Sequence, residues 1–181
     1  MKLKLNGVIL DNDTATIYRY FGLDAISPKL ISLTIDKLAE GEELEIDLNS
    51  PGGYCSAGAA IYSMLKAASA AGHEVIINVI GEACSAATVV MCGADTVKGS
   101  RASTYMFHNA SLHGASGKSR DMRSYAQSLE ETDESIINVY EERTGKTRDE
   151  LHELIDAETW MNVNRAIEYG FVDEIYLCHQ E

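Results

Sequence analysis

The 181-residue chain carries 28 acidic and 15 basic side chains, which gives a formal net charge of −13. This acidity argues against binding to nucleic acid, whose phosphates require a basic surface, and against binding to anionic lipid. Hydrophobic residues make up 45% of the sequence, but no apolar stretch reaches the ~20 residues of a bilayer-spanning helix. We therefore expect one domain, residues 1–181, with no nucleic acid and no membrane among its partners.

The cysteines and the first residues both bear on the compartment. The beginning of the chain lacks the apolar run and small-residue cleavage site of an export signal. The four cysteines have neither the paired spacing of a zinc site nor the density of a disulfide scaffold; they are Cys55, Cys84, Cys92 and Cys178. A reducing, cytoplasmic location is the simplest interpretation, and we expect no metal.

The first quarter of the chain predicts a strand, a helix and a second strand. Apolar and polar residues alternate from Lys2 to Leu10, and the polar cluster Asp11–Asp13 ends this strand. Ser27–Pro28 is typical of a helix start, and the helix should end near Gly41. Leu44–Leu48 then predicts a short strand.

The next segment repeats the order of helix and strand. Apolar spacing predicts a helix over Ala57–Ala68, and the β-branched run Val75–Ile80 predicts a strand that is covered on both faces. Small residues over Ala83–Ala87 lead into a buried helix that ends at Met91.

The second half of the chain contains the longest predicted helix. Ser103–Phe107 predicts a strand, and the apolar positions of Ser119–Glu142 predict a long amphipathic helix. A short helix from Val163 and a strand over Val172–Tyr176 complete the chain. Strands that alternate with helices indicate an α/β fold with a mostly parallel sheet.

Three of the predicted strands end in segments suited to chemistry. They are followed by Ser50–Gly53, by Ser85 and by His108, and ligands of open α/β sheets bind at the carboxyl ends of strands. A serine hydroxyl needs a base within hydrogen-bond reach to act as a nucleophile. The pair could therefore be catalytic; alternatively, Ser85 is a helix N-cap and His108 a hydrogen-bonded residue at a strand end.

Five segments resemble, in order and approximate spacing, those of the ClpP-type serine peptidases. They are Asp47–Gly53 (DLNSPGG), Gly81–Ala87 (GEACSAA), Tyr105–Asn109 (YMFHN), Glu142–Gly145 (ERTG) and Ala166–Glu174 (AIEYGFVDE). The resemblance is closest to the shorter branch of phage and prophage ClpP-like head maturation proteases. It implies a ClpP/crotonase-like α/β fold of repeated ββα units, with a mostly parallel sheet and a long handle helix at Ser119–Glu142.

The resemblance also assigns roles to single residues. It makes Ser85 the nucleophile and His108 the general base, with the backbone N–H groups of Gly53 and Ala86 as the oxyanion hole. Gly52 and Gly53 would pair with an extended substrate backbone. Cys84 stands where the family usually has a small residue, and we interpret it as a small buried side chain.

The acid that orients His108 has two candidates. Matching the flanking motifs without gaps points to Glu158, whereas residue type favours Asp156. In an extended segment both side chains would point to the same side, so the sequence leaves both open. Trp160, nearby, is expected to have a packing role.

The resemblance further implies a peptide or protein substrate, no cofactor, and a homo-oligomer in the form of a heptameric ring or double ring. The first strand begins almost at Met1, which argues against the longer pore loop of authentic ClpP and makes docking to an unfoldase ATPase doubtful. The substrate of the phage branch would be a capsid or scaffold protein. Two other functions stay open, a crotonase-like acyl-CoA lyase or hydratase that would not need Ser85, and an inactive ring subunit that serves as a scaffold.

Overall fold

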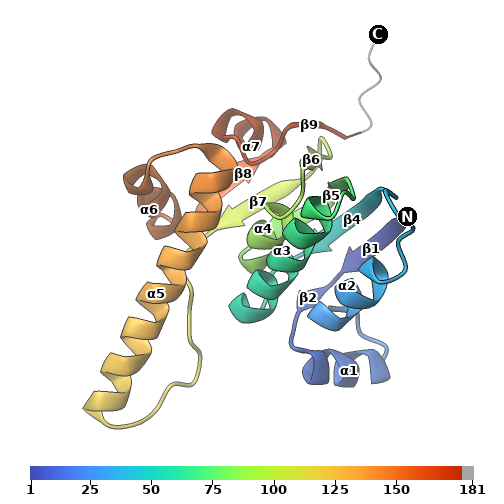
Figure 1. Ribbon diagram of the computed structural model, residues 1–181. Helices are drawn as coiled ribbons and strands as arrows, with labels where there is room; N and C mark the ends of the chain where they lie inside the picture. Colours follow the sequence, from blue (N-terminus) through green and yellow to red (C-terminus); the bar gives the residue numbers. More distant parts are fainter. Residues whose placement is uncertain (177–181) are drawn as a thin grey trace.

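The computed structural model describes residues 1–176 and has an α/β architecture (Figure 1). Its strands are β1 (Lys2–Asn6), β2 (Val8–Ile9), β3 (Ala25–Ile26), β4 (Leu44–Ser50), β5 (Val75–Cys84), β6 (Thr96–Gly99), β7 (Thr104–Phe107), β8 (Thr159–Asn162) and β9 (Glu174–Ile175). Its helices are α1 (Asn12–Tyr20), α2 (Pro28–Ile35), α3 (Cys55–Ala70), α4 (Ala86–Met91), α5 (Ser119–Thr144), α6 (Arg148–Asp156) and α7 (Val163–Tyr169). Cys178 lies outside the described residues.

The main sheet is mostly parallel, as the sequence predicts. Its order is β1-β4-β5-β6-β9, and β7 joins it by pairing with β5. Along the edge opposite β4, the strand β5 is long enough to pair with two strands in turn, with β6 through Ile76–Val79 and with β7 through Glu82–Cys84. Within residues 1–176, the one antiparallel pair of this sheet joins β7 to β8. Because β7 runs parallel to the last residues of β5 and pairs with them, the carboxyl ends of the two strands lie side by side.

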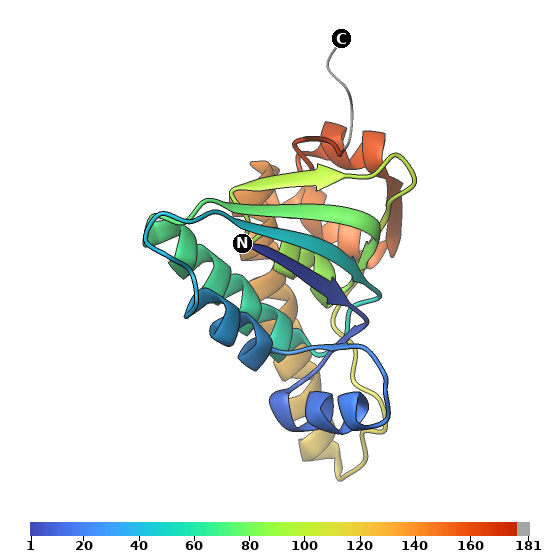
Figure 2. The same ribbon diagram turned by 90° about the vertical axis from the view of Figure 1, so that its right-hand side faces the viewer.

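The two faces of the sheet differ in polarity. Figure 2 shows β1, β4, β5 and β6 side by side, with α2 and α3 along one face. Toward the helices, Val75, Ile77 and Val79 of β5 are fully buried. On the other face Ile80 is 41% exposed, and the amide of Asn78 donates to carboxylates of β4. The prediction that this strand is covered on both faces therefore holds for the helix-facing side only, since the other face is polar at the fully buried Asn78 and open at Ile80.

The N-terminal region departs from its prediction. The first strand bends at Gly7, and its continuation β2 pairs with β3 in a separate small sheet. The carboxylate of Asp11 accepts hydrogen bonds from the N–H groups of Asp13 and Thr14, so the polar cluster that follows the strand also begins the unpredicted helix α1. The predicted helix after Ser27 ends earlier than expected, at Ile35.

Five short elements are not predicted from the sequence: α1, β3, β6, α6 and β8. None has more than nine residues, so a pattern has little length in which to show, although the buried Leu151, Leu154 and Ile155 of α6 do recur at helical spacing. Strands β6 and β8 form because they pair with the neighbouring strands β5 and β7. The helices and strands that the sequence does predict are present, with shifted ends. No helix within residues 1–176 is long and apolar enough to cross a membrane.

Aromatic side chains join β7 to the C-terminal half of α5. Phe107 stacks on Phe171 with ring centroids 4.3 Å apart, and Tyr140 of α5 meets both rings edge-on. All three side chains are at most 1% exposed. The hydroxyl of Tyr140 is 2.5 Å from that of Thr88 in α4, so this buried polar group is satisfied. The cluster thereby fixes α5 against the strand that precedes His108.

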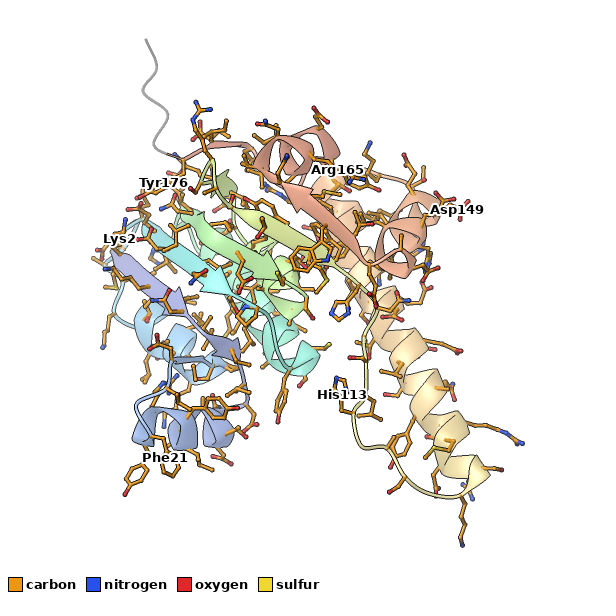
Figure 3. All side chains as sticks on the ribbon, turned by 180° about the vertical axis from the view of Figure 1, so that it is seen from behind. Lys2, Phe21, His113, Asp149, Arg165 and Tyr176 are labelled. Atoms are coloured by element: carbon orange, nitrogen blue, oxygen red, sulfur yellow. The ribbon has the colours of Figure 1, made fainter. Side chains whose placement is uncertain are left out.

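We expect Phe171→Ala to lower the free energy of unfolding by roughly 3–5 kcal/mol, because it opens a cavity in this cluster. Phe21→Ala removes a ring that is 71% exposed at the far end of the molecule (Figure 3) and should cost less than about 0.5 kcal/mol. Urea denaturation at one fixed protein concentration measures both. Equal losses in the two variants would contradict the assignment of Phe171 to the core.

Candidate functional site

Ser85 lies at a tight turn between the end of β5 and the start of α4. Its backbone has φ of 54° and ψ of −126°, a conformation that costs a residue with a side chain of order 1–3 kcal/mol. Its N–H donates to the carbonyl of Met106 in β7, and its carbonyl accepts from the N–H and the hydroxyl of Thr88. These bonds hold the turn and project the side chain out of the sheet.

His108 directly follows β7 and reaches the same point. Its Nε2 is 2.8 Å from Oγ of Ser85, a hydrogen-bond distance. The two residues are brought together because β7 pairs with the last residues of β5, which places both strand ends at one edge. The structure therefore joins the serine and the histidine that the sequence analysis singled out.

The glycine turn after β4 lies against this pair. Gly52 has φ of +97°, and a Cβ built there would lie 2.5 Å from the carbonyl oxygen of Cys84 and 2.7 Å from Cβ of Ser85. A side chain at this position is therefore excluded by both conformation and space. Gly53, with φ of +145°, approaches Ile9 of β2 equally closely.

The N–H groups of Gly53 and Ala86 have different surroundings. Ile9 donates to the carbonyl of Gly52 and accepts from the N–H of Tyr54, which directs the intervening N–H of Gly53 away from β2. Ala86 is the first residue of α4, so its N–H has no acceptor within the helix. Both residues line one cavity of about 670 Å³ together with Ser85 and His108.

That cavity extends from Ser85 along helix α5. Beyond the serine it is bounded by the start of α3, by residues that follow His108 and by one side of α5. Its lining from α5 is mixed, with Ile136 and Val139 near the body and Ser124, Gln127 and Glu131 farther out. The space is large enough for a side chain and part of a peptide backbone.

The two candidate acids lie in different local structures. Asp156 is the last residue of α6, and its Oδ1 accepts a 2.8 Å hydrogen bond from the amide of Asn109. Glu158 is exposed and has a left-handed backbone with φ of 47°. The expectation of an extended segment is wrong, since α6 continues through Asp156. Within residues 1–176, neither carboxylate is hydrogen-bonded to His108.

A third carboxylate near the pair was missed. Asp133 of α5 accepts a 2.6 Å hydrogen bond from the N–H of Ala110, two residues after His108. Burial raises the pKa of its carboxyl and the Asp156 carboxylate adds to this rise, while the Ala110 N–H and the nearby His152 and His108 act in the opposite direction. The sequence offers no signal for Asp133, which lies among other charged residues on a helix.

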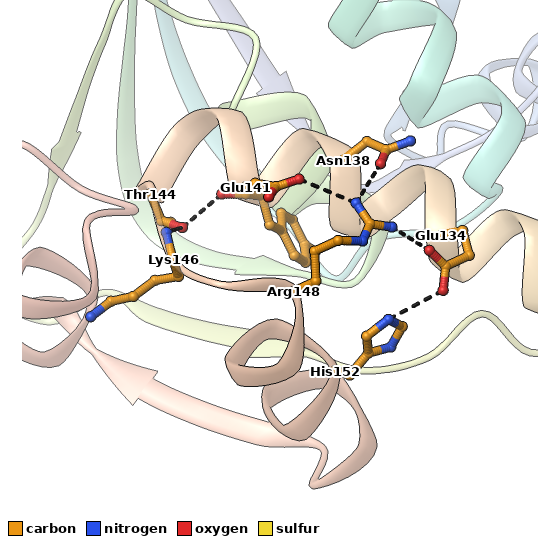
Figure 4. A network of polar contacts seen from close by, with 8 residues as sticks. Glu134, Asn138, Glu141, Thr144, Lys146, Arg148 and His152 are labelled. Carbon is orange, nitrogen blue, oxygen red and sulfur yellow. Dashed lines mark hydrogen bonds and ion pairs between the residues drawn. The ribbon is translucent and has the colours of Figure 1, made fainter.

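A polar network holds α6 against α5 (Figure 4). The guanidinium of Arg148 pairs with Glu134 and is 3.2 Å from Glu141, while Asn138 accepts a hydrogen bond from it at 2.7 Å. His152 lies 3.2 Å from the other oxygen of Glu134. The network therefore fixes the helix that ends at Asp156.

Cys84 and Trp160 differ in how far they are buried. Cys84 is 3% exposed, and burial, with the nearby Glu82 carboxylate, raises the pKa of its thiol to about 11. Little thiolate is present at neutral pH, which agrees with its interpretation as a small buried side chain. Trp160 is 58% exposed, so within this chain it has little of the packing role expected of it.

Comparison with known proteins identifies the family. The sequence model of the family described as Clp protease matches residues 23–178. The chain belongs to the Clp protease family. It is 31% identical over 179 residues to the ATP-dependent Clp protease proteolytic subunit 1 of Chlamydia muridarum, with 92% of this chain and 90% of the relative covered. The corresponding protein of Chlamydia trachomatis serovar D is 32% identical over 186 residues, with 97% and 94% covered.

A solved structure supports the fold independently. A mutant of ClpP1 from Listeria monocytogenes superimposes with a TM-score of 0.77, covering 98% of this chain and 92% of that chain at 22% sequence identity. The α/β fold with its mostly parallel sheet and long helix α5 is thus that of a Clp protease subunit. None of these similarities singles out the phage and prophage branch of the family.

The glycine turn provides a test of the site geometry. Gly52→Ala should lower the rate at which a fluorophosphonate labels Ser85 by about 100-fold, because the new Cβ displaces the turn beside the serine. Gly41→Ala is the matched control, since Gly41 also has positive φ (+71°) but has no atom within 4 Å of an added Cβ. Unchanged labelling in Gly52→Ala would show that the turn does not shape the site.

Proposed function

We propose that the chain is a serine endopeptidase, the proteolytic subunit of a Clp-type protease, with Ser85 as nucleophile and His108 as general base. The observation that carries the proposal is the 2.8 Å contact between Oγ of Ser85 and Nε2 of His108 beside the glycine turn. Membership in the Clp protease family supports the same reaction class. The buried Cys84, whose thiol has a raised pKa, is no competitor as nucleophile.

The reaction follows from the roles of this pair. Oγ of Ser85 attacks the scissile carbonyl carbon while its proton passes to Nε2 of His108. The C–N bond then breaks, and the imidazolium gives this proton to the leaving amine. Water attacks the resulting ester, its proton passes to His108, and Oγ of Ser85 takes that proton back as the acid product leaves.

The oxyanion of each tetrahedral intermediate would be bound by the N–H groups of Gly53 and Ala86. Both amides border the cavity that contains the pair, and neither is used by the neighbouring strand or helix. Donors fixed in advance stabilise the developing charge by about 3 kcal/mol each. Gly52 and Gly53 would also pair with an extended substrate backbone, which makes binding tolerant of side chains.

The assembly and the substrate are part of the same proposal. We infer a homo-oligomer in the cytoplasm, a heptameric ring or double ring in which α5 is the contact between subunits. The relatives are named as ATP-dependent, so an unfoldase ATPase is a partner to test. The sequence resemblance to the phage and prophage branch makes a capsid or scaffold protein the substrate to test first.

Ser85→Ala tests the nucleophile. Turnover of casein or of a capsid protein should fall about 10⁶-fold, because the acyl acceptor is lost. Cys84→Ala, which changes the adjacent residue, should keep both turnover and fluorophosphonate labelling. Equal turnover by wild type and Ser85→Ala would remove the serine from the mechanism and leave a scaffold or an acyl-CoA enzyme as the function.

The acid of the triad is tested by charge-removing variants. We propose Asp156 and Glu158 as the candidates, and the contact of Asp156 with Asn109 favours Asp156. Asp156→Asn should lower kcat about 10⁴-fold if it holds the base in the correct tautomer, whereas Glu158→Gln should then have little effect. The reverse order in measured kcat would assign the role to Glu158.

A further inference from the structure

Three consecutive residues after β7 are each attached to a different helix. His108 contacts Ser85 at the start of α4, Asn109 donates to Asp156 at the end of α6, and Ala110 donates to Asp133 in α5. The last of these bonds is 2.6 Å long, the shortest of the three. The position of the imidazole therefore depends on α5 as well as on the strand that carries it.

The charge of Asp133 faces several titratable groups. His108 follows β7, His152 and Asp156 belong to α6, and all three interact electrostatically with the Asp133 carboxyl. Its negative charge also reaches α3, where it helps to raise the pKa of the Cys55 thiol, although burial is the larger cause. Asp133 itself is half-buried, so the field of its charge is less screened by solvent than that of an exposed side chain.

We propose that Asp133 is a positioning residue for His108, fixing the segment that follows the base to α5 and placing a negative charge within electrostatic reach of the imidazole. The inference rests on the proposed function, in which His108 becomes positively charged each time it takes the proton of Ser85. A nearby carboxylate stabilises that imidazolium. The hydrogen bond to Ala110 limits how far the ring can move away from the serine.

The carboxylates of Asp133, Asp156 and Glu158 make different contacts. Asp156 directs one oxygen to the side chain of Asn109, and Glu158 is exposed. Asp133 instead binds the backbone, so its hold on the segment does not depend on which side chain occupies position 110. One group on α5 thereby supplies both an anchor and a charge to the base.

Two substitutions separate the anchor from the charge. Asp133→Asn keeps an oxygen that can accept from the Ala110 N–H but removes the charge, whereas Asp133→Ala removes both. The measurement is the second-order rate of fluorophosphonate labelling at Ser85 as a function of pH, with the assembled full-length protein. Glu130→Gln is the matched control, because it removes one negative charge from an exposed position one turn earlier on the same helix.

We expect labelling at neutral pH to fall about 10-fold in Asp133→Asn and about 100-fold in Asp133→Ala, within the range of general-base effects. Without the negative charge the protonated imidazole is less favoured, so the acidic limb of the pH profile should move to lower pH in both variants. A shift of about one pH unit corresponds to a tenfold change in that protonation equilibrium. Glu130→Gln should match the wild type in rate and in profile.

Several results would overturn the inference. Asp133 variants that match Glu130→Gln in rate and profile would remove any role, and a lower rate with an unmoved acidic limb in Asp133→Asn would reduce Asp133 to a structural residue. Melting temperature and elution volume identify a misfolded Asp133→Ala, in which case the profile of Asp133→Asn decides. Absence of labelling in the wild type would instead count against the proposed function, so the two failures are distinguishable.

Discussion

The backbone of Ser85 is held in a left-handed conformation by hydrogen bonds on both of its sides, and the rest of the site is arranged around this turn. The bond from its N–H to Met106 ties it to β7, and the bonds from Thr88 to its carbonyl tie it to α4. Because β7 ends at the same level, the next residues of that strand arrive beside the serine hydroxyl. The hydrogen bonds between β5 and β7 thus offset the conformational cost of the turn.

Sequence patterns predict the long elements well and the short ones poorly. The strand β5 and the helices α3 and α5 have enough residues for apolar periodicity to be visible, and each is found within a few residues of its predicted range. The helix α1 is not predicted, because Asp11 marks the end of a strand in the sequence pattern, although an aspartate at such a position equally caps a helix. Strands β6 and β8 exist because their neighbours offer unpaired edges, which no local pattern records.

Within the site, too, local patterns are predictable from the sequence and contacts between distant elements are not. Ser85, His108 and the glycine turn stand at strand ends, and strand ends can be predicted from the sequence. The attachments of Asn109 and Ala110 depend on how α5 and α6 pack across the sheet, and the network around Arg148 sets that packing. Asp133 has no motif that separates it from its acidic neighbours on the helix. Its contact with Ala110, two residues after His108, follows only from tertiary structure.

The contact between β2 and the glycine turn has a consequence for where the fold can be shortened. Ile9 forms backbone hydrogen bonds on either side of Gly53, yet it precedes residues 23–178, the region shared with the family model. A protein trimmed to the shared region would keep the serine, the histidine and the strands that carry them. It would lose the Ile9 hydrogen bonds that orient the glycine turn, so Ser85 and His108 would be intact beside a turn without its support.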